Sequence, residues 1–152
     1  MNWLSGLLVM QAVLNVPAYS PPNALPPAGD AGRLSVVVAT TVSETDPQPL
    51  CDRPNCTSLF LGRYRDARTL AGPAVDPEFS ARVEMGSPWN QPYKLVLIIE
   101  ERPGQERLVR AMTGFNGRTG QACFDRRDIA GLNWTAEGAG LSNTNGTLCV
   151  TE

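Results

Sequence analysis

Residues 77–112, PEFSARVEMGSPWNQPYKLVLIIEERPGQERLVRAM, carry the clearest fold signal in the chain. Apolar and polar residues alternate from Phe79 to Met85, and a dense apolar run follows from Tyr93 to Ile99. Arg102-Pro103-Gly104-Gln105 interrupts this run, and Leu108 to Met112 resumes it. Period-two alternation with a turn signal between runs predicts an antiparallel meander of two strands and the start of a third.

The run from Tyr93 is apolar on both of its faces. One face carries Leu95, Leu97 and Ile99, and the other carries Val96 and Ile98. Such a strand needs cover on both sides, so we expect a second sheet, a helix or loops to pack on it.

Two glutamates, Glu100 and Glu101, follow this run. Neighbours on a strand point to opposite faces, so these two do not form the paired carboxylates of a glycosidase. We interpret them as a polar strand end that discourages pairing with another chain.

Two further strands are expected before this stretch. Leu34 to Val42 is rich in β-branched residues and alternates in the manner of a strand with one buried face. Thr45 to Asn55 is polar and contains proline, which predicts a loop. Ser58 to Leu70 reads as the second strand, and Gly62 within it predicts a bulge or a bend.

The C-terminal part contributes a helix and a short strand to the expected fold. Residues 124–132, FDRRDIAGL, are the best helix candidate, with Asp125 as its cap and Gly131 as its end. Leu148-Cys149-Val150 is expected to be the final strand. We therefore predict a mainly β fold, a small antiparallel, OB-like barrel of five to six strands with one short late helix; a β-sandwich is the alternative.

The arrangement loosely resembles the secreted OB-type barrels of the netrin and metalloproteinase-inhibitor group. The resemblance rests on Cys56, the Phe60-Leu61-Gly62 run, the strand from Phe79 to Met85, and Cys123. It covers about half of the domain and implies a barrel fold. The Cys-x-Cys start of the inhibitors is absent here, so no inhibitory role is carried over.

Composition excludes several classes of function. The 152 residues carry a net charge of −2 without a long block of one sign, which gives no reason to expect nucleic acid as a partner. No histidine is present, which removes the commonest general base and the commonest zinc ligand. No motif indicates a cofactor. Arginine exceeds lysine twelve to one, which we interpret as the coding bias of a GC-rich, bacterial genome.

The N-terminus favours export. Trp3 to Val16 is too short to span a bilayer, which needs ~20 residues, but has the length of a signal-peptide core. We predict a signal peptide over residues 1–18, a proline-rich linker over 19–32 and one β-rich domain over 33–152, with no stable membrane span after processing. The expected location is periplasmic or secreted. No positive charge precedes the apolar run, and a buried N-terminal helix is the alternative.

Four cysteines follow the expected cleavage point: Cys51, Cys56, Cys123 and Cys149. An even number in an exported chain predicts two disulfides, and three connectivities are open. The turn residues between Cys51 and Cys56 favour a bridge there, which leaves Cys123 to pair with Cys149. Free buried thiols are the alternative, and a metal or redox site is disfavoured by the spacing.

No motif names a reaction, so the function is inferred from what could bind. The leading interpretation is an exported, non-enzymatic domain that binds a protein, a glycan or an envelope partner through Trp89, Tyr93 and Phe115. Trp89 could equally be a lid over the core. A hydrolase that uses carboxylates such as Asp125 and Asp128 is one alternative, and a purely structural secreted protein is another.

The second strand also carries Arg63 and Arg65 on one face. They could bind an anion as a strip. The favoured interpretation is a solvated strand in which Asp66 and nearby acids are their partners.

Overall fold

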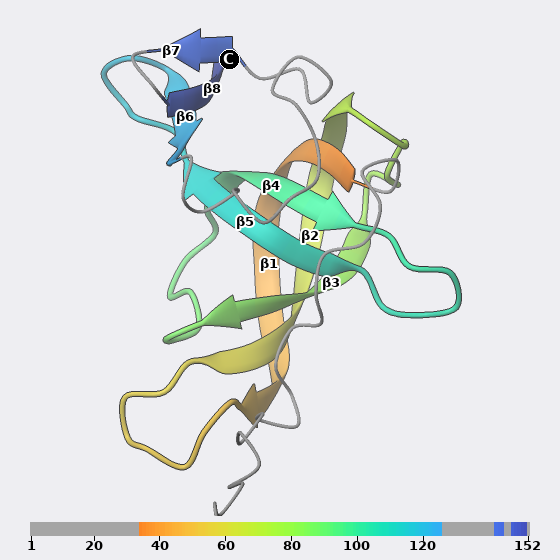
Figure 1. Cartoon of the computed structure of the whole chain (residues 1–152), viewed down its shortest axis with the longest axis vertical. Coiled ribbons are helices and arrows are strands. Elements are labelled where there is room, and N and C mark those ends of the chain that lie inside the picture. Colours follow the sequence, from red (N-terminus) through yellow and green to blue (C-terminus); the bar gives the residue numbers. More distant parts are fainter. Residues whose placement is uncertain (1–33, 126–141, 145–146, 152) are drawn as a thin grey trace, which may run out of the picture.

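The computed structural model describes residues 34–125, 142–144 and 147–151, and these residues form eight strands (Figure 1). Their bounds are β1 Leu34–Pro49, β2 Ser58–Ala71, β3 Phe79–Met85, β4 Lys94–Glu100, β5 Leu108–Gly114, β6 Gln121–Phe124, β7 Ser142–Thr144 and β8 Thr147–Thr151.

Five strands close a barrel in the order β1-β2-β3-β5-β4. β1 pairs with β2 on one side and with β4 on the other, and all neighbours are antiparallel except β3 and β5. This confirms the predicted mainly β, small-barrel fold. A five-stranded barrel with this non-sequential order has the Greek-key character of OB-type barrels.

The expected meander is correct in one half and wrong in the other. β4 and β5 form the predicted antiparallel hairpin. β3 does not lie next to β4; it meets β5 in parallel at the single residue pair Arg82–Leu108. The reason is barrel closure. β4 pairs with β5 along one edge and with β1 along the other, so no edge of β4 is left for β3. The connection from β3 to β4 therefore crosses the end of the barrel instead of forming a tight turn.

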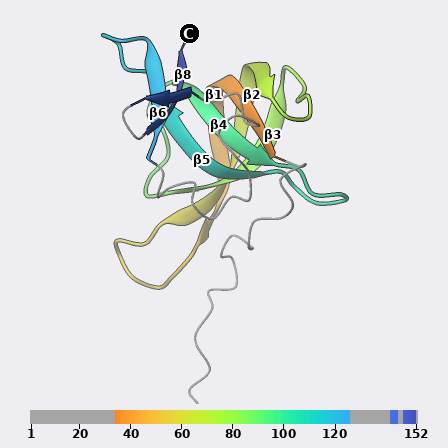
Figure 2. The same cartoon turned by 45° about the horizontal axis from the view of Figure 1, so that its top comes forward.

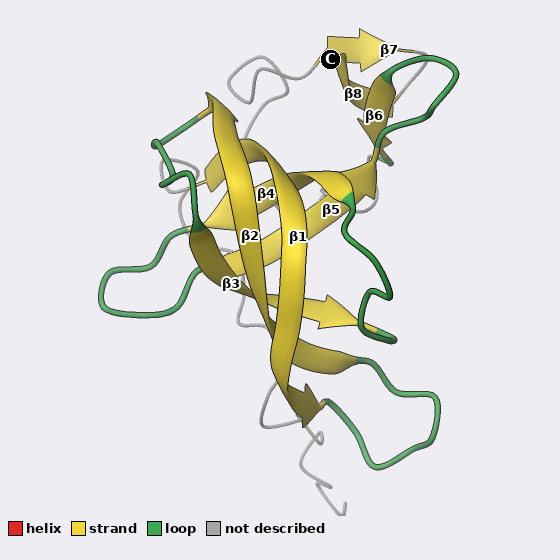
Figure 3. Ribbon diagram, turned by 180° about the vertical axis from the view of Figure 1, so that it is seen from behind, coloured by secondary structure: helices red, strands yellow, loops and turns green. Residues whose placement is uncertain are grey.

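The first strand is longer than predicted. Pairing of β1 with β2 continues to Pro49, so residues 45–49, which were expected to be loop, are strand. Four register shifts along this ladder accommodate the irregular sequence. The resulting β1–β2 hairpin projects beyond the barrel (Figure 3), and the Cys51–Cys56 disulfide closes its tip.

The two-sided cover expected for β4 is confirmed, and the cover is partly a second sheet. Leu95, Leu97 and Ile99 face the barrel interior, where they join a core that includes Phe60, Tyr64 and Phe79. Val96 and Ile98 face outward into a second apolar cluster, completed by the following buried residues: Leu34, Val36, Val38, Ala122, Phe124 and Val150. The three-stranded sheet β6-β8-β7 therefore packs on the outside of the barrel beside β1 and β4 (Figure 2).

Both predicted disulfides are present. Cys51 is bonded to Cys56, and Cys123 is bonded to Cys149, its register partner across β6 and β8. No cysteine is free. The final strand is also confirmed as β8. Two disulfides are typical of a domain that folds in an oxidising, extracellular-type environment.

Several predictions concern residues that the structure does not describe. The signal peptide, the linker and helix residues 126–132 lie outside the described ranges. Phe124, expected to begin that helix, is instead the last residue of β6, where its buried ring joins the outer cluster. Among the described residues, no helix is long and apolar enough to cross a membrane.

The bulge expected at Gly62 is absent, because no register shift falls at this residue on either side of β2; the nearest shift lies one residue away, between the pairs Thr41–Tyr64 and Ser43–Arg63. The bend, the other expectation for Gly62, stays a prediction. The glycine is required for space. A Cβ at Gly62 would lie 2.8 Å from the hydroxyl of Tyr64, whose ring stacks on Phe79 with centroids 4.9 Å apart. The Tyr64 hydroxyl is buried and has no hydrogen-bond partner among the described residues. Burial, and then the charge of Glu44, raise the pKa of Tyr64 above its ordinary value.

Replacing Tyr64 with phenylalanine is expected to raise the free energy of unfolding by about 1 kcal/mol, because a buried hydroxyl without a partner costs roughly 1–3 kcal/mol. The stacking on Phe79 stays. Urea unfolding measures the change. Tyr93→Phe is the matched control, since its hydroxyl is on the surface and bonds Asn90. A loss of stability in Tyr64→Phe larger than in the control would contradict the prediction.

Candidate functional site

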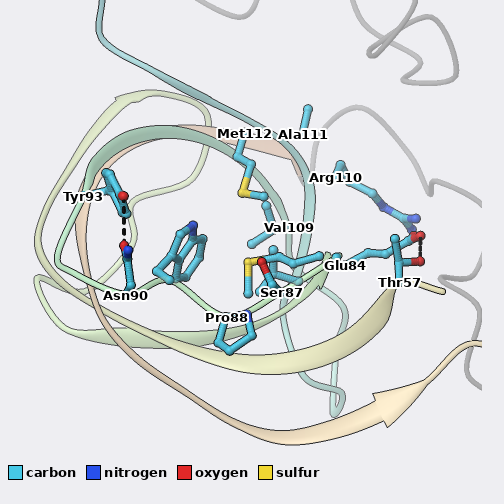
Figure 4. A pocket seen from close by; sticks show the side chains of 14 residues that line it. Thr57, Glu84, Ser87, Pro88, Asn90, Tyr93, Val109, Arg110, Ala111 and Met112 are labelled. Atoms are coloured by element: carbon cyan, nitrogen blue, oxygen red, sulfur yellow. Dashed lines mark hydrogen bonds between the residues drawn. The ribbon is translucent and has the colours of Figure 1, made fainter. Parts of the chain in front are cut away.

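A pocket of about 930 Å³ opens between β3 and β5 (Figure 4). We call it the β3–β5 pocket. Its volume lies in the range of about 300–1,000 Å³ that is usual for ligand sites. The residues that line it are Thr57, residues 83–90, Tyr93 and residues 109–112.

The pocket runs along two strand edges. Three consecutive residues of β3, Val83 to Met85, and four of β5, Val109 to Met112, line it. Successive side chains of a strand point to opposite faces, so a cavity lined by consecutive residues lies at the edge of the strand and not on one face. In the described chain β3 and β5 share only the Arg82–Leu108 pair, and the strand segments beyond it have no partner on this side.

The backbone of β3 therefore presents hydrogen-bonding groups to the pocket. The Arg82 amide donates to the Arg107 carbonyl at 2.8 Å, which shows that Arg82 directs its N–H toward β5. Alternate residues of a strand direct their N–H and C=O groups to the same edge. Glu84 consequently offers its N–H and C=O to the pocket.

The connection from β3 to β4, residues 86–93, forms one wall of the pocket and is anchored to β1. The Tyr93 amide donates to the Thr41 hydroxyl at 2.8 Å, and the Thr41 amide donates to the Tyr93 carbonyl at 2.9 Å. Glu44 accepts a hydrogen bond from the Trp89 backbone, which partly offsets the rise in the pKa of Glu44 that burial causes. β1 thus holds the wall at two points, Tyr93 and Trp89.

Trp89 joins this wall to the core. Its half-buried ring packs on the interior cluster and meets the Tyr64 ring edge-on, with centroids 6.1 Å apart. An aromatic ring in this position contributes apolar contact area to the pocket and keeps the connection in place. Trp89 therefore packs on the core and also lines the pocket.

Two hydrogen-bonded pairs form the polar rim (Figure 4). The Tyr93 hydroxyl donates to the Asn90 side chain at 3.1 Å on one side. The Thr57 hydroxyl donates to the Glu84 carboxylate at 2.6 Å on the other. An apolar floor with a few polar groups at its margin is the usual build of a binding site.

The three contact residues expected from the sequence are not all together. Trp89 and Tyr93 line the β3–β5 pocket. Phe115 packs on the outer cluster, and the Lys94 ammonium lies 5.8 Å from its ring centroid. The strand-edge residues of the pocket were not identified from the sequence, because an unpaired edge has no local sequence signal.

Searches of protein families, curated proteins and solved structures find no match to this chain. The site has to be interpreted from its own geometry. Within the described ranges, no three Cys, Asp or Glu side chains form a group that could hold a metal ion. Of the two carboxylates suggested for a hydrolase, Asp125 follows β6, and Asp128 lies outside the described residues.

A buried ion-pair cluster lies beside the pocket and corrects the interpretation of Glu100. This glutamate is 1% exposed and not a solvated strand end. Its carboxylate pairs with Arg110, which also lines the pocket, and with Arg102 at 3.3 Å. Burial follows from position, since Glu100 pairs with Leu34 and Leu108, both buried. Glu101 points the other way and pairs with Arg107 at 2.7 Å.

Proposed function

We propose that this protein is an exported, non-enzymatic binding domain that takes an extended segment of a partner protein into the β3–β5 pocket. The observation that supports this most directly is that the two strand edges along the pocket have no strand paired with them there in the described part of the chain. An added strand gains main-chain hydrogen bonds from such an edge and places alternate side chains in the adjoining apolar space. A periplasmic or secreted location is part of the proposal, and the two disulfides support it.

The composition of the pocket also favours a peptide. Its apolar floor is formed by Val83, Met85, Val109 and Met112, and methionine side chains adapt to different partners. Among the described residues that line it, Glu84 is the one carboxylate, whereas hydrolysis of a glycoside uses two. We therefore place binding ahead of the hydrolase alternative at this site.

The test is a pair of substitutions at Glu84. Glu84→Pro removes the N–H that the strand offers to the pocket, and edge positions of a sheet tolerate proline. Glu84→Ala removes the side chain and keeps the N–H. A photoreactive amino acid at Ser87 in the wall is expected to cross-link a discrete partner peptide in the native host. The adduct should be lost in the proline variant and kept in the alanine variant.

The controls separate binding from folding. The thermal midpoint of both variants shows whether each is folded. The same photoreactive residue at Ser80, an exposed position outside the pocket lining, should give no such adduct. Equal adducts from both positions, or equal loss in the alanine and proline variants, would contradict strand addition.

A further inference from the structure

A second site lies on the outer face of the barrel. β2 carries three exposed arginines, Arg63, Arg65 and Arg68, and β4 begins with Lys94, the one lysine in the sequence. Thr40 of β1 is the register partner of both Arg65 and Lys94. Since neighbouring strands lie about 4.8 Å apart, the backbones of these two cations are about 10 Å apart. We call the four residues the cationic strip.

A bulge at Asp66 places Arg68 in the strip. In a regular strand, residues three apart point to opposite faces. Asp66 has a φ of 54°, and the β1–β2 register shifts here, so that Thr40 pairs with Arg65 and Val38 with Arg68. Three steps along β2 thus match two steps along β1. The extra residue returns Arg68 to the face of Arg65, as bulges that re-aim a side chain do.

The three arginines of the strip carry more positive charge than the carboxylates near them in the described chain balance. Arg65 lies 3.5 Å from the Asp66 carboxylate, but both side chains are more than half exposed, which makes this a weak pair. Glu78, next to the register partner of Tyr64, is a second carboxylate at this end of β2 and β3, and Asp76, two positions earlier, lies 3.8 Å from Arg107. Within the described chain, Arg63 and Arg68 form no ion pair. By contrast, Arg82, Arg107 and Arg110 each contact a carboxylate.

The strip also has a concave part. A hollow of about 370 Å³ lies between Arg68, Lys94 and Asp66, over the β1 segment from Val38 to Thr40. The ring of Phe115 lies beneath the Lys94 ammonium, a cation–π arrangement that restrains the lysine at the rim. A ligand group in the hollow would therefore meet cations from two strands.

We propose that the cationic strip binds an anionic glycan through its carboxylate, sulfate or phosphate groups. Guanidinium forks match the geometry of these oxyanions, and a row of them along one strand suits a chain with repeated charges. A glycan fits better than a lipid surface, because the exposed large hydrophobic residues of the described chain are Val42 and Tyr93, too few to insert into a bilayer. The strip lies on β2 and β4, on either side of β1, and shares no residue with the β3–β5 pocket, so the two proposals are independent.

The test measures affinity and its dependence on salt for the full chain with its disulfides intact. The probes are polygalacturonate, dextran sulfate, neutral dextran and phosphatidylglycerol vesicles, in calorimetric titrations at 50 and 200 mM NaCl. With about 0.8 counterions released per contact, four contacts should weaken binding to the polyanions roughly 80-fold over this range. Neutral dextran should not bind.

Two double variants with the same net charge distinguish binding by the strip from nonspecific attraction to arginines elsewhere on the surface. Arg65→Gln with Arg68→Gln leaves two contacts, so binding should be weaker and should fall only about tenfold between the two salt concentrations. Arg53→Gln with Arg118→Gln changes two exposed loop arginines and should behave as the wild type. Asp66→Gly keeps the backbone freedom of the bulge, removes a carboxylate, and should bind at least as tightly as the wild type.

Three results would overturn the proposal. The first is equal loss in both double variants, which would mean that exposed arginines contribute to binding wherever they lie on the surface. The second is no saturable binding of either charged glycan at 50 mM NaCl. The third is binding to the vesicles but to neither glycan, which would assign the strip to a membrane surface.

Discussion

Replacing Glu100 with alanine is expected to lower the free energy of unfolding by about 3–5 kcal/mol, because removing one partner of a buried ion pair is strongly destabilising. Glu100 is 1% exposed, and the side chains of its partners Arg110 and Arg102 are 8% and 22% exposed. Urea unfolding with the disulfides intact measures the change. A loss of this size is a large fraction of the free energy of unfolding of an ordinary domain.

The neighbouring glutamate is the matched control. Glu101→Ala removes a carboxylate one position along the chain, but Glu101 and its partner Arg107 are 36% and 29% exposed. A pair open to water in this way contributes about 1 kcal/mol or less. Replacing both Glu100 and Arg110 with leucine should restore much of the stability, because a buried pair can be exchanged for apolar residues at little cost. Similar losses in Glu100→Ala and Glu101→Ala would refute the burial argument.

Removing the Cys123–Cys149 disulfide is expected to cost about 3 kcal/mol, because the bridge closes a loop across 26 positions and restricts the unfolded chain. The loss should appear as earlier urea unfolding of Cys123→Ser with Cys149→Ser. The outer cluster should open first, since Val150 and Ala122 belong to the strands that this bridge joins.

The hairpin disulfide provides the comparison. Cys51 and Cys56 are five positions apart, and the loop they close is small and exposed. The chain-entropy effect grows with loop length, so Cys51→Ser with Cys56→Ser should cost less. Equal costs would indicate that the larger bridge acts through local packing and not through the unfolded chain.

Much of the barrel follows from local sequence. Alternation from Phe79 to Met85 defines β3, and the two-sided apolar run defines β4 as a strand covered on both faces. Periodicity succeeds here because it reports which side chains avoid water, and that requirement is the same whichever strands pair. The late helix was misjudged at Phe124, since a capping residue after an apolar ring fits the end of a strand as well as the start of a helix.

The candidate site was predicted less well, for a physical reason. Of the three contact residues expected from the sequence, Trp89 and Tyr93 line the β3–β5 pocket, and Phe115 packs on the outer cluster instead. The strand edges that offer backbone hydrogen-bonding groups to the pocket exist only because β3 lies next to β5 and not next to β4. Neighbour relations of this kind are set by closure of the whole barrel, so no short stretch of sequence contains them.

The sequence alone determined that the chain is mainly β, that β4 is covered on both faces, and that its four cysteines suit two bridges, because residue spacing and polarity act locally. Only the tertiary structure decided which strands are neighbours. The parallel contact of β3 with β5 opens the pocket, the barrel wall buries Glu100 with Arg110, and the bulge at Asp66 aligns Arg68 with Arg65. Each of these depends on register between distant segments, which the chain acquires only when the barrel closes.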